Sequence, residues 1–224
     1  MAEQAALFEP KVLDGLSPRK RTSMLRALEA LVAPDPKVRK DGLAKLTALD
    51  AHRRSPLAAA ILATRIREPD LELRTAIVDA LAVVIAPGRE GERPADRVLR
   101  WVRNNLSSMR TREVFALLQI LARSSRHRQQ VCILLDACSF SGDTLVKILR
   151  DRSADVPIRI AAAEAIAEVG FLDAKTAIED LHQRIAGREA GQMQMGFASR
   201  LDTEIEELLP ALQEALLALE EAAD

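Results

Sequence analysis

The sequence predicts an all-α protein in which similar helical hairpins follow one another as a solenoid. Three observations lead to this prediction: the composition, the lack of sheet patterning and a motif that returns along the chain. Of the 224 residues, 48% are apolar but only 3% are aromatic, and tyrosine is absent. Ala, Leu, Ile and Val mixed with charged residues form a composition that favours helices. Alternating polar and apolar runs bounded by turn residues, which would predict a sheet, do not occur.

A short motif, Asp-x-x-aliphatic-Arg, occurs three times, and each copy begins an apolar helical pattern. The copies are DPKVR from Asp35, DLELR from Asp70 and DVPIR from Asp155. Apolar residues lie one position before each arginine and four, seven and ten positions after it, which is one face of an α-helix. Each aspartate stands where its carboxylate can cap the helix N-terminus. The arginines that complete the motif are Arg39, Arg74 and Arg159.

A fourth, weaker copy begins at Arg110, where Leu106 stands in place of the capping aspartate. The four arginines are then 35, 36 and 49 residues apart, and the longest gap predicts an inserted helix around RHRQQVCILLDAC. Self-similarity at this period is typical of a helical solenoid, in which each unit buries its apolar face against its neighbours. The apolar residues that follow this copy at the same offsets are Val114, Leu117 and Ile120.

Another apolar-periodic segment precedes each motif helix, so the repeating unit is a first helix, a turn and a second helix. Ser17 with Pro18, Ser55 with Pro56, and Pro94 are helix start signals for the first three of these segments. The expected first helices are SPRKRTSMLRALEALV, SPLAAAILATRI, PADRVLRWVRNNL and GDTLVKILRD.

These motifs and spacings resemble those of HEAT repeats, including the bacterial phycobilin-lyase-like variety. The resemblance covers residues 17–187 and implies a right-handed α-α superhelix of the HEAT/armadillo type, with about four or five hairpins. Residues 1–16 are then an N-terminal arm, and residues 188–224 are a connector and an acidic capping helix of the same domain. In HEAT proteins the turn aspartates and second-helix arginines stack as a ladder between repeats. The resemblance therefore assigns a structural role to Asp35, Arg39, Asp70, Arg74, Asp155 and Arg159.

Charge is distributed unevenly along the chain, although the net charge is only −1. Residues 1–112 hold 21 Lys/Arg and 14 Asp/Glu, whereas residues 113–224 hold 11 and 19. Because sequence order is spatial order in a solenoid, we expect one basic and one acidic end, which bears on partners and association rates. The acidic C-terminal segment RLDTEIEELLPALQEALLALEEAAD keeps a helical apolar stripe. This stripe favours a cap that closes the last repeat over a helix that docks on a partner.

No arrangement of residues predicts catalysis, a cofactor or a metal site. Cys132 and Cys138 are six positions apart on one expected helix, so they lie on different faces and are expected to be buried reduced thiols. Glu179 and His182 have the spacing used in di-iron bundles, but the second pair that such a site needs is missing. We therefore expect a non-enzymatic protein.

The N-terminal stretch MAEQAALFEPKVLDGL carries acidic residues early and lacks the apolar run of a secretory signal. No apolar stretch of the sequence reaches the roughly 18 residues needed to span a bilayer. We therefore expect a soluble, cytoplasmic protein without membrane contact, for which reduced cysteines are also typical.

A protein–protein scaffold, adaptor or assembly factor is the function expected from these features. In the HEAT family the second helices usually line the concave face, and residues there outside the core stripe are candidates for contact with a partner. Lysines predominate at one end of this face and glutamates at the other, which predicts a partner of complementary polarity. The candidate partner-binding residues are Lys37, Lys40, Lys45, Glu72, Asp79, Arg112, Glu164 and Glu168, with Asp41 and Glu113 beside them.

Three other interpretations stay open. Arg93, Arg97 and Arg100 have helical spacing near Trp101 and could bind nucleic-acid phosphates, although DNA glycosylases of HEAT-like shape use several aromatic residues on a basic face. Phycobilin lyases share the repeat, so a lyase-type maturation factor is a second alternative. Head-to-tail self-association of basic and acidic ends, instead of a monomer, is a third.

Overall fold

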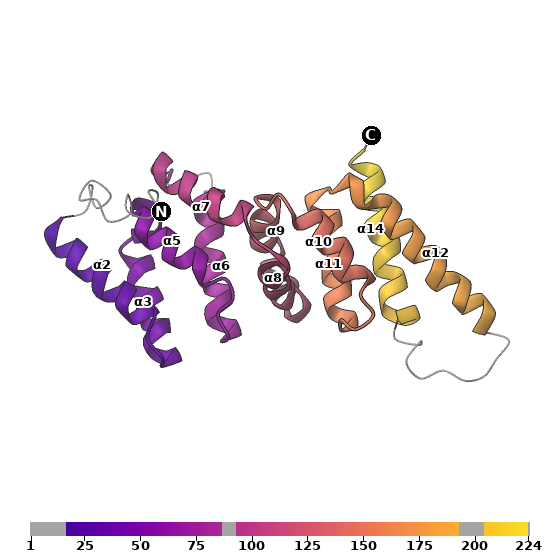
Figure 1. The fold of residues 1–224 in the computed structure, drawn as a ribbon, viewed down its shortest axis with the longest axis horizontal. Coiled ribbons are helices and arrows are strands. Elements are labelled where there is room, and N and C mark those ends of the chain that lie inside the picture. Colours follow the sequence, from indigo (N-terminus) through magenta and orange to yellow (C-terminus); the bar gives the residue numbers. More distant parts are fainter. Residues whose placement is uncertain (1–16, 87–92, 193–203, 224) are drawn as a thin grey trace. The chain divides into compact units, whose positions relative to one another are not determined.

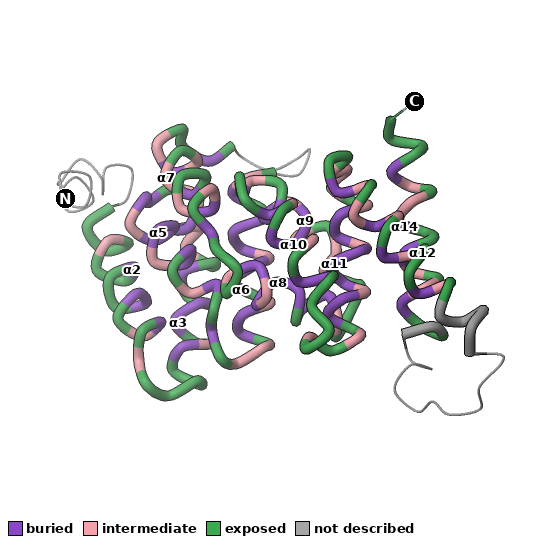
Figure 2. Tube along the Cα trace, turned by 45° about the vertical axis from the view of Figure 1, so that its right-hand side comes forward, coloured by how far each residue is buried: buried purple, intermediate pink, exposed green. Residues whose placement is uncertain are grey.

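Every described element of the protein is helical, which confirms the all-α prediction. The computed structural model describes residues 17–86, 93–192 and 204–223, and no strand occurs among them. The chain divides into two compact units, Met1–Ser108 (unit 1) and Met109–Asp224 (unit 2). Figure 1 shows that each unit consists of helices packed side by side, and in Figure 2 their buried faces point toward one another within each unit.

Unit 1 begins with a hairpin, α2 and α3, whose helices approach very closely. The apolar side chains of Met24, Leu28 and Leu31 on α2 are buried with those of Leu43 and Leu46 on α3. Burial of such side chains supplies the main driving force for packing. The helices of unit 1 are α2 (Pro18–Leu31), α3 (Pro36–Ala48), α4 (Ala51–Arg54), α5 (Pro56–Thr64), α6 (Leu71–Ile85) and α7 (Asp96–Ser107).

Unit 2 is centred on α11, which contacts α8, α9, α10 and α14. Four of its buried residues are alanines (Ala161, Ala162, Ala163 and Ala165), and their small side chains let neighbouring helices approach it closely. The elements of unit 2 are α8 (Thr111–Arg123), η2 (Ser125–His127), α9 (Arg128–Asp136), α10 (Ser141–Arg150), α11 (Val156–Val169), η3 (Leu172–Ala174), α12 (Lys175–Gln192), the π-helical η4 (Glu204–Leu208) and α14 (Leu209–Glu221).

The predicted start signals begin the expected helices. Ser17 and Ser55 accept hydrogen bonds from backbone N–H groups of α2 and α5, and a proline follows each serine at the first helical position. The helix expected from Pro94 starts two residues later, at Asp96. The inserted helix predicted around RHRQQVCILLDAC is α9.

The fourth motif copy differs from the other three. Arg110 is exposed and precedes α8 as its N-cap, whereas the motif arginines lie inside their helices. Leu106 therefore does not replace a capping aspartate but is buried in α7. Glu113 instead accepts a hydrogen bond from the Arg110 N–H at 3.0 Å, which satisfies the start of the helix. The apolar stripe of this copy, Val114, Leu117 and Ile120, is buried as expected.

The C-terminal helix packs its apolar stripe inside unit 2, as a cap would. Leu208, Leu212, Ala215 and Leu219 are buried, and α14 contacts α11 and α12. The boundary expected at residue 187 falls inside α12, which continues to Gln192. The predicted N-terminal arm (1–16) and most of the predicted connector, residues 193–203, lie outside the described residues.

Candidate functional site

The motif arginines bind backbone carbonyls of the turn or the helix end that precedes their helices. Arg39 Nη1 donates to the carbonyls of Ala33 at 3.0 Å and Pro34 at 2.6 Å. Arg74 Nε donates to Glu68 O at 2.7 Å. All three arginines are buried, and each satisfies carbonyls that a turn or helix end would otherwise leave without partners. The third motif arginine, Arg159, donates through Nε to Leu149 O at 2.9 Å.

A carboxylate that the sequence did not single out, Glu68, joins the first two hairpins. Its side chain is completely buried between Arg39, whose Nη2 lies 2.6 Å from Oε1, and Arg65, whose Nη2 lies 3.1 Å from Oε2. Arg65 also donates to the carbonyl of Leu31 at the end of α2. For Arg39, the carboxylate partner is therefore this glutamate and not the aspartate that the HEAT resemblance implies.

The motif aspartates act at the ends of their own helices. Asp35 accepts from Lys37 N and Asp70 from Leu73 N, both at 2.9 Å. This bond from Leu73 is the main reason why the pKa of Asp70 is lowered. Asp155 occupies the same position before α11, but its side chain accepts no capping bond from the described residues. The cause is local, because Pro157 has no N–H and the Ile158 N–H binds the backbone carbonyl of Asp155.

Two of the predicted partner-binding residues, Lys40 and Glu72, meet across a groove between α3 and α6. The groove has a volume of about 240 Å³ and an apolar lining that includes Leu43 and Leu73. Lys40 Nζ lies 2.7 Å from Glu72 Oε2, and this hydrogen bond raises the pKa of Lys40. Lys40 also lies 3.3 Å from Asp70 Oδ2. The other residues that line the groove are Ala44, Thr47 and Ala76.

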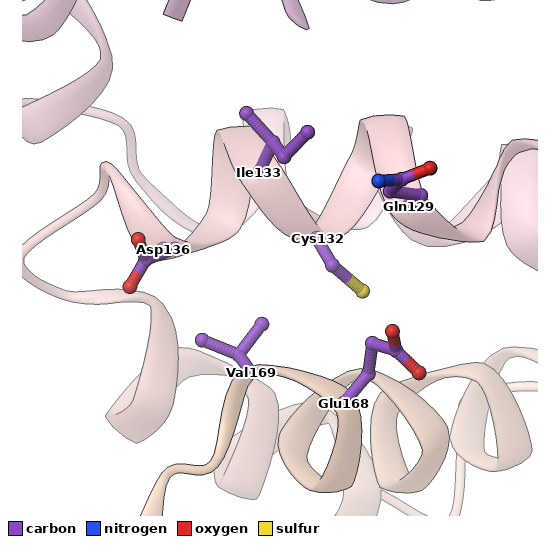
Figure 3. A pocket seen from close by; sticks show the side chains of 6 residues that line it. All are labelled: Gln129, Cys132, Ile133, Asp136, Glu168 and Val169. Atoms are coloured by element: carbon purple, nitrogen blue, oxygen red, sulfur yellow. The ribbon is translucent and has the colours of Figure 1, made fainter. Parts of the chain in front are cut away.

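A second groove lies in unit 2 between α9 and α11 (Figure 3), with a volume of about 290 Å³. The predicted residue Glu168 lines it, and Glu164, one helical turn earlier, forms an ion pair with Arg128 at 2.9 Å. The remaining lining residues are Gln129, Cys132, Ile133, Asp136 and Val169.

The remaining predicted partner-binding residues line neither groove. Lys37 and Lys45 are exposed on α3, Asp79 is half-buried on α6, and Arg112 is exposed on α8. The structure thus brings together the pair Lys40 and Glu72 in unit 1 and places Glu168 in the groove of unit 2.

The two cysteines are buried and unbridged, as expected. Burial raises the pKa of Cys132 to about 12, and it also raises that of Cys138. A thiol with such a pKa carries almost no thiolate at neutral pH, so it is a poor nucleophile. Within the described part of the chain, no group of three or more His, Cys, Asp or Glu residues is placed to hold a metal ion.

The arginine row of the nucleic-acid alternative is only partly helical. Arg97 and Arg100 belong to α7, opposite a buried face, whereas Arg93 precedes the helix. Arg93 and Arg100 are exposed, while Arg97 and Trp101 are half-buried. Of the two arginines in the helix, only Arg100 is therefore exposed, next in sequence to an indole that is only partly accessible.

Comparisons of the chain with known protein families, curated proteins and solved structures give no match. Of the helices in the described ranges, none combines the length and the apolar character that crossing a membrane requires.

Proposed function

We propose that the chain is a HEAT-like α-solenoid that acts as a non-enzymatic adaptor and binds another protein along the two grooves. The observation that carries this proposal is the pair of grooves between neighbouring helices, each lined by both apolar and charged residues. An apolar centre with a polar rim is the usual composition of a protein interface.

The solenoid part of the proposal is supported by the equivalent roles of the motif arginines. Arg39, Arg74 and Arg159 each lie in the fourth position of their helix, are buried and bind carbonyls of the preceding turn or helix end. Three hairpins that share the same arginine–carbonyl hydrogen bonding have the character of one repeated unit, and solenoids consist of such units.

The size of the grooves favours side chains of a partner over a cofactor. Their volumes of about 240 and 290 Å³ fall at or below the lower end of the range of small-molecule sites, roughly 300–1,000 Å³. Residues that bind hot-spot side chains of a partner need only pockets of this size.

Affinity capture from native cell extract, with and without nuclease, tests the adaptor function. We expect the same protein to be recovered in both arms and to be lost when Ala44, an exposed residue that lines the α3–α6 groove, is replaced by arginine. Lys40 is better left unchanged, because it is bound to Asp70 and Glu72 and its replacement would also alter stability. A matched control replaces Ala48, which is exposed on α3 and does not line the groove, by arginine.

Nucleic-acid binding is the second candidate, because Arg93 and Arg100 are exposed and Arg100 precedes Trp101 directly in the sequence. It predicts that nuclease removes all captured material and that affinity falls steeply with salt. It also predicts loss of binding when Arg93, Arg97 and Arg100 are replaced by glutamine. A lyase-type maturation factor would instead require a bound chromophore in the captured material.

A further inference from the structure

Along the groove between α9 and α11, an acidic residue of α11 occurs twice, one helical turn apart, but only the first one faces a basic residue of α9. At one end of the groove, Arg128 of α9 reaches across to Glu164 of α11, with Nη2 and Oε2 2.9 Å apart. One helical turn further along both helices, the equivalent residues are Cys132 and Glu168. Residues four apart lie on the same face of a helix, so the second carboxylate faces a thiol where the first faces a guanidinium.

Among the residues that the structure describes, Glu168 therefore has no cationic partner. Within the described residues, neither Glu168 nor Asp136 takes part in an ion pair or a side-chain hydrogen bond. Both carboxylates are exposed and line the same groove. Figure 3 shows the Glu168 carboxylate and the Cys132 sulfur pointing into the gap between the two helices. Cys132 is only 6% exposed, and its thiol has no hydrogen-bond partner among these residues.

The lining of the groove matches the two chemical parts of a long basic side chain. The side chains of Cys132, Ile133 and Val169 provide apolar contact for an aliphatic stem, and the amide of Gln129 adds a polar acceptor. Lysine and arginine bury their stems along apolar surface while the charged group stays near water or a carboxylate. Charge-assisted bonds between a guanidinium and a carboxylate are among the strongest of this type.

We infer that this groove binds a lysine or arginine side chain of the partner protein, with its charged group at the Glu168 carboxylate, opposite Cys132 (Figure 3). The inference rests on the proposed adaptor function and names the chemistry of one contact. The partner's cation provides the positive charge that pairs with Glu168, as Arg128 provides the charge that pairs with Glu164.

A titration of the ¹⁵N-labelled full chain with acetyl-Gly-Arg-Gly-amide tests this inference. We expect amide shifts confined to the lining residues of α9 and α11, and a response at least about fivefold weaker with the citrulline analogue, which is nearly isosteric but neutral. Glu168→Gln should weaken binding of the arginine peptide about tenfold, in line with the loss of a charged hydrogen bond. Glu214→Gln, on the exposed side of α14, is the matched control and should bind as the wild type does.

Equal shifts with the citrulline peptide, or unchanged binding to Glu168→Gln, would overturn the inference. So would self-association that Glu168→Gln abolishes, because the occupant would then be a second copy of the chain. The proposed function is tested separately. If the wild-type protein captures no protein from extract, the adaptor function is contradicted, whatever the result of the peptide titration. If wild type and Glu168→Gln capture the same protein equally well, the adaptor stands and this contact does not.

Discussion

Glu68 is the residue on which the packing of the first two hairpins most depends. Its buried carboxylate lies between the guanidinium groups of Arg39 and Arg65, and both arginines also bind carbonyls near the end of α2. Removing one partner of a buried ion pair leaves the other charges uncompensated, which costs about 3–5 kcal/mol. Replacing Glu68 should therefore lower the free energy of unfolding.

We expect Glu68→Gln to lower the free energy of unfolding by about 3 kcal/mol, measured by urea denaturation of the full chain. Glu29→Gln, on an exposed position of α2, is the control and should change it by less than about 0.5 kcal/mol. A loss below about 1 kcal/mol for Glu68→Gln would show that the buried pairs are not held as described.

Gly42 allows α2 and α3 to touch through their backbones. A Cβ atom at this position would lie 2.7 Å from Leu31 N and 2.8 Å from Ala27 O, and backbone atoms cannot move aside as a flexible side chain can. We expect Gly42→Ala to destabilise the protein by about 1–3 kcal/mol in the same urea assay, although alanine is the better helix former.

The control for Gly42→Ala is Gly187→Ala in α12, where an added Cβ meets no atom within 4 Å. This change should stabilise the protein by up to about 1 kcal/mol. If both substitutions stabilise, α2 and α3 do not approach each other as closely as the structure shows.

His52 makes the free energy of unfolding depend on pH. It is buried in α4, and burial lowers its pKa below the ordinary value of 6.5. The unfolded chain therefore binds more protons than the folded chain in the range below pH 6.5, so stability is full above this pH and falls as the pH drops through it. We expect His52→Leu to reduce the difference in unfolding free energy between pH 7.5 and pH 5.5 relative to the wild-type protein. An unchanged difference in this variant would contradict the assignment to His52.

At the scale of the residue, the repeated arginines could be recognised from the sequence, but their partners could not. The regular spacing of Arg39, Arg74 and Arg159 was visible in the sequence, but helical periodicity marked only the apolar residues around them as inside. The burial of the arginines themselves is a finding of the structure. Glu68 lies in a turn, where a charged residue is normally solvated, and only the packing of two hairpins brings it between two arginines.

The elements were predictable where local signals set them. Serine–proline and aspartate caps begin four helices as expected, and the long gap between motif copies correctly predicted α9. The end of α12 was not predictable, because Gly187 and the polar residues after it read as a connector and yet continue the helix. Propensity is a weak prior that tertiary context overrides.

The packing of α9 can be followed through its cysteine. Since the pKa of Cys132 is raised to about 12, roughly one thiol in ten thousand is ionised at pH 8 while the helix stays packed. We expect a disulfide reagent such as dithionitrobenzoate to modify neither Cys132 nor Cys138 rapidly in the native protein, and both within seconds in denaturant. Fast reaction of Cys132 in native buffer would show that α9 opens or is packed differently, and fast reaction of Cys138 would show the same of the turn that follows α9.

At the scale of the molecule, the two units carry opposite charge. Unit 1 holds 19 Lys/Arg and 14 Asp/Glu, and unit 2 holds 13 and 19. This contrast was visible from the sequence, because it needs only counting. The grooves were not, since the pair Lys40–Glu72 and the opposition of Glu168 to Cys132 arise from contacts between helices that are distant in sequence.

The most direct test of the adaptor function is photo-crosslinking in living cells. Benzoylphenylalanine replaces Ala44, an exposed residue that lines the α3–α6 groove, or Thr64, an exposed residue at the end of α5. We predict a light-dependent adduct with one protein from position 44 and none from position 64. Adducts from position 64 alone, or none from either position, would contradict binding of a protein partner at this groove.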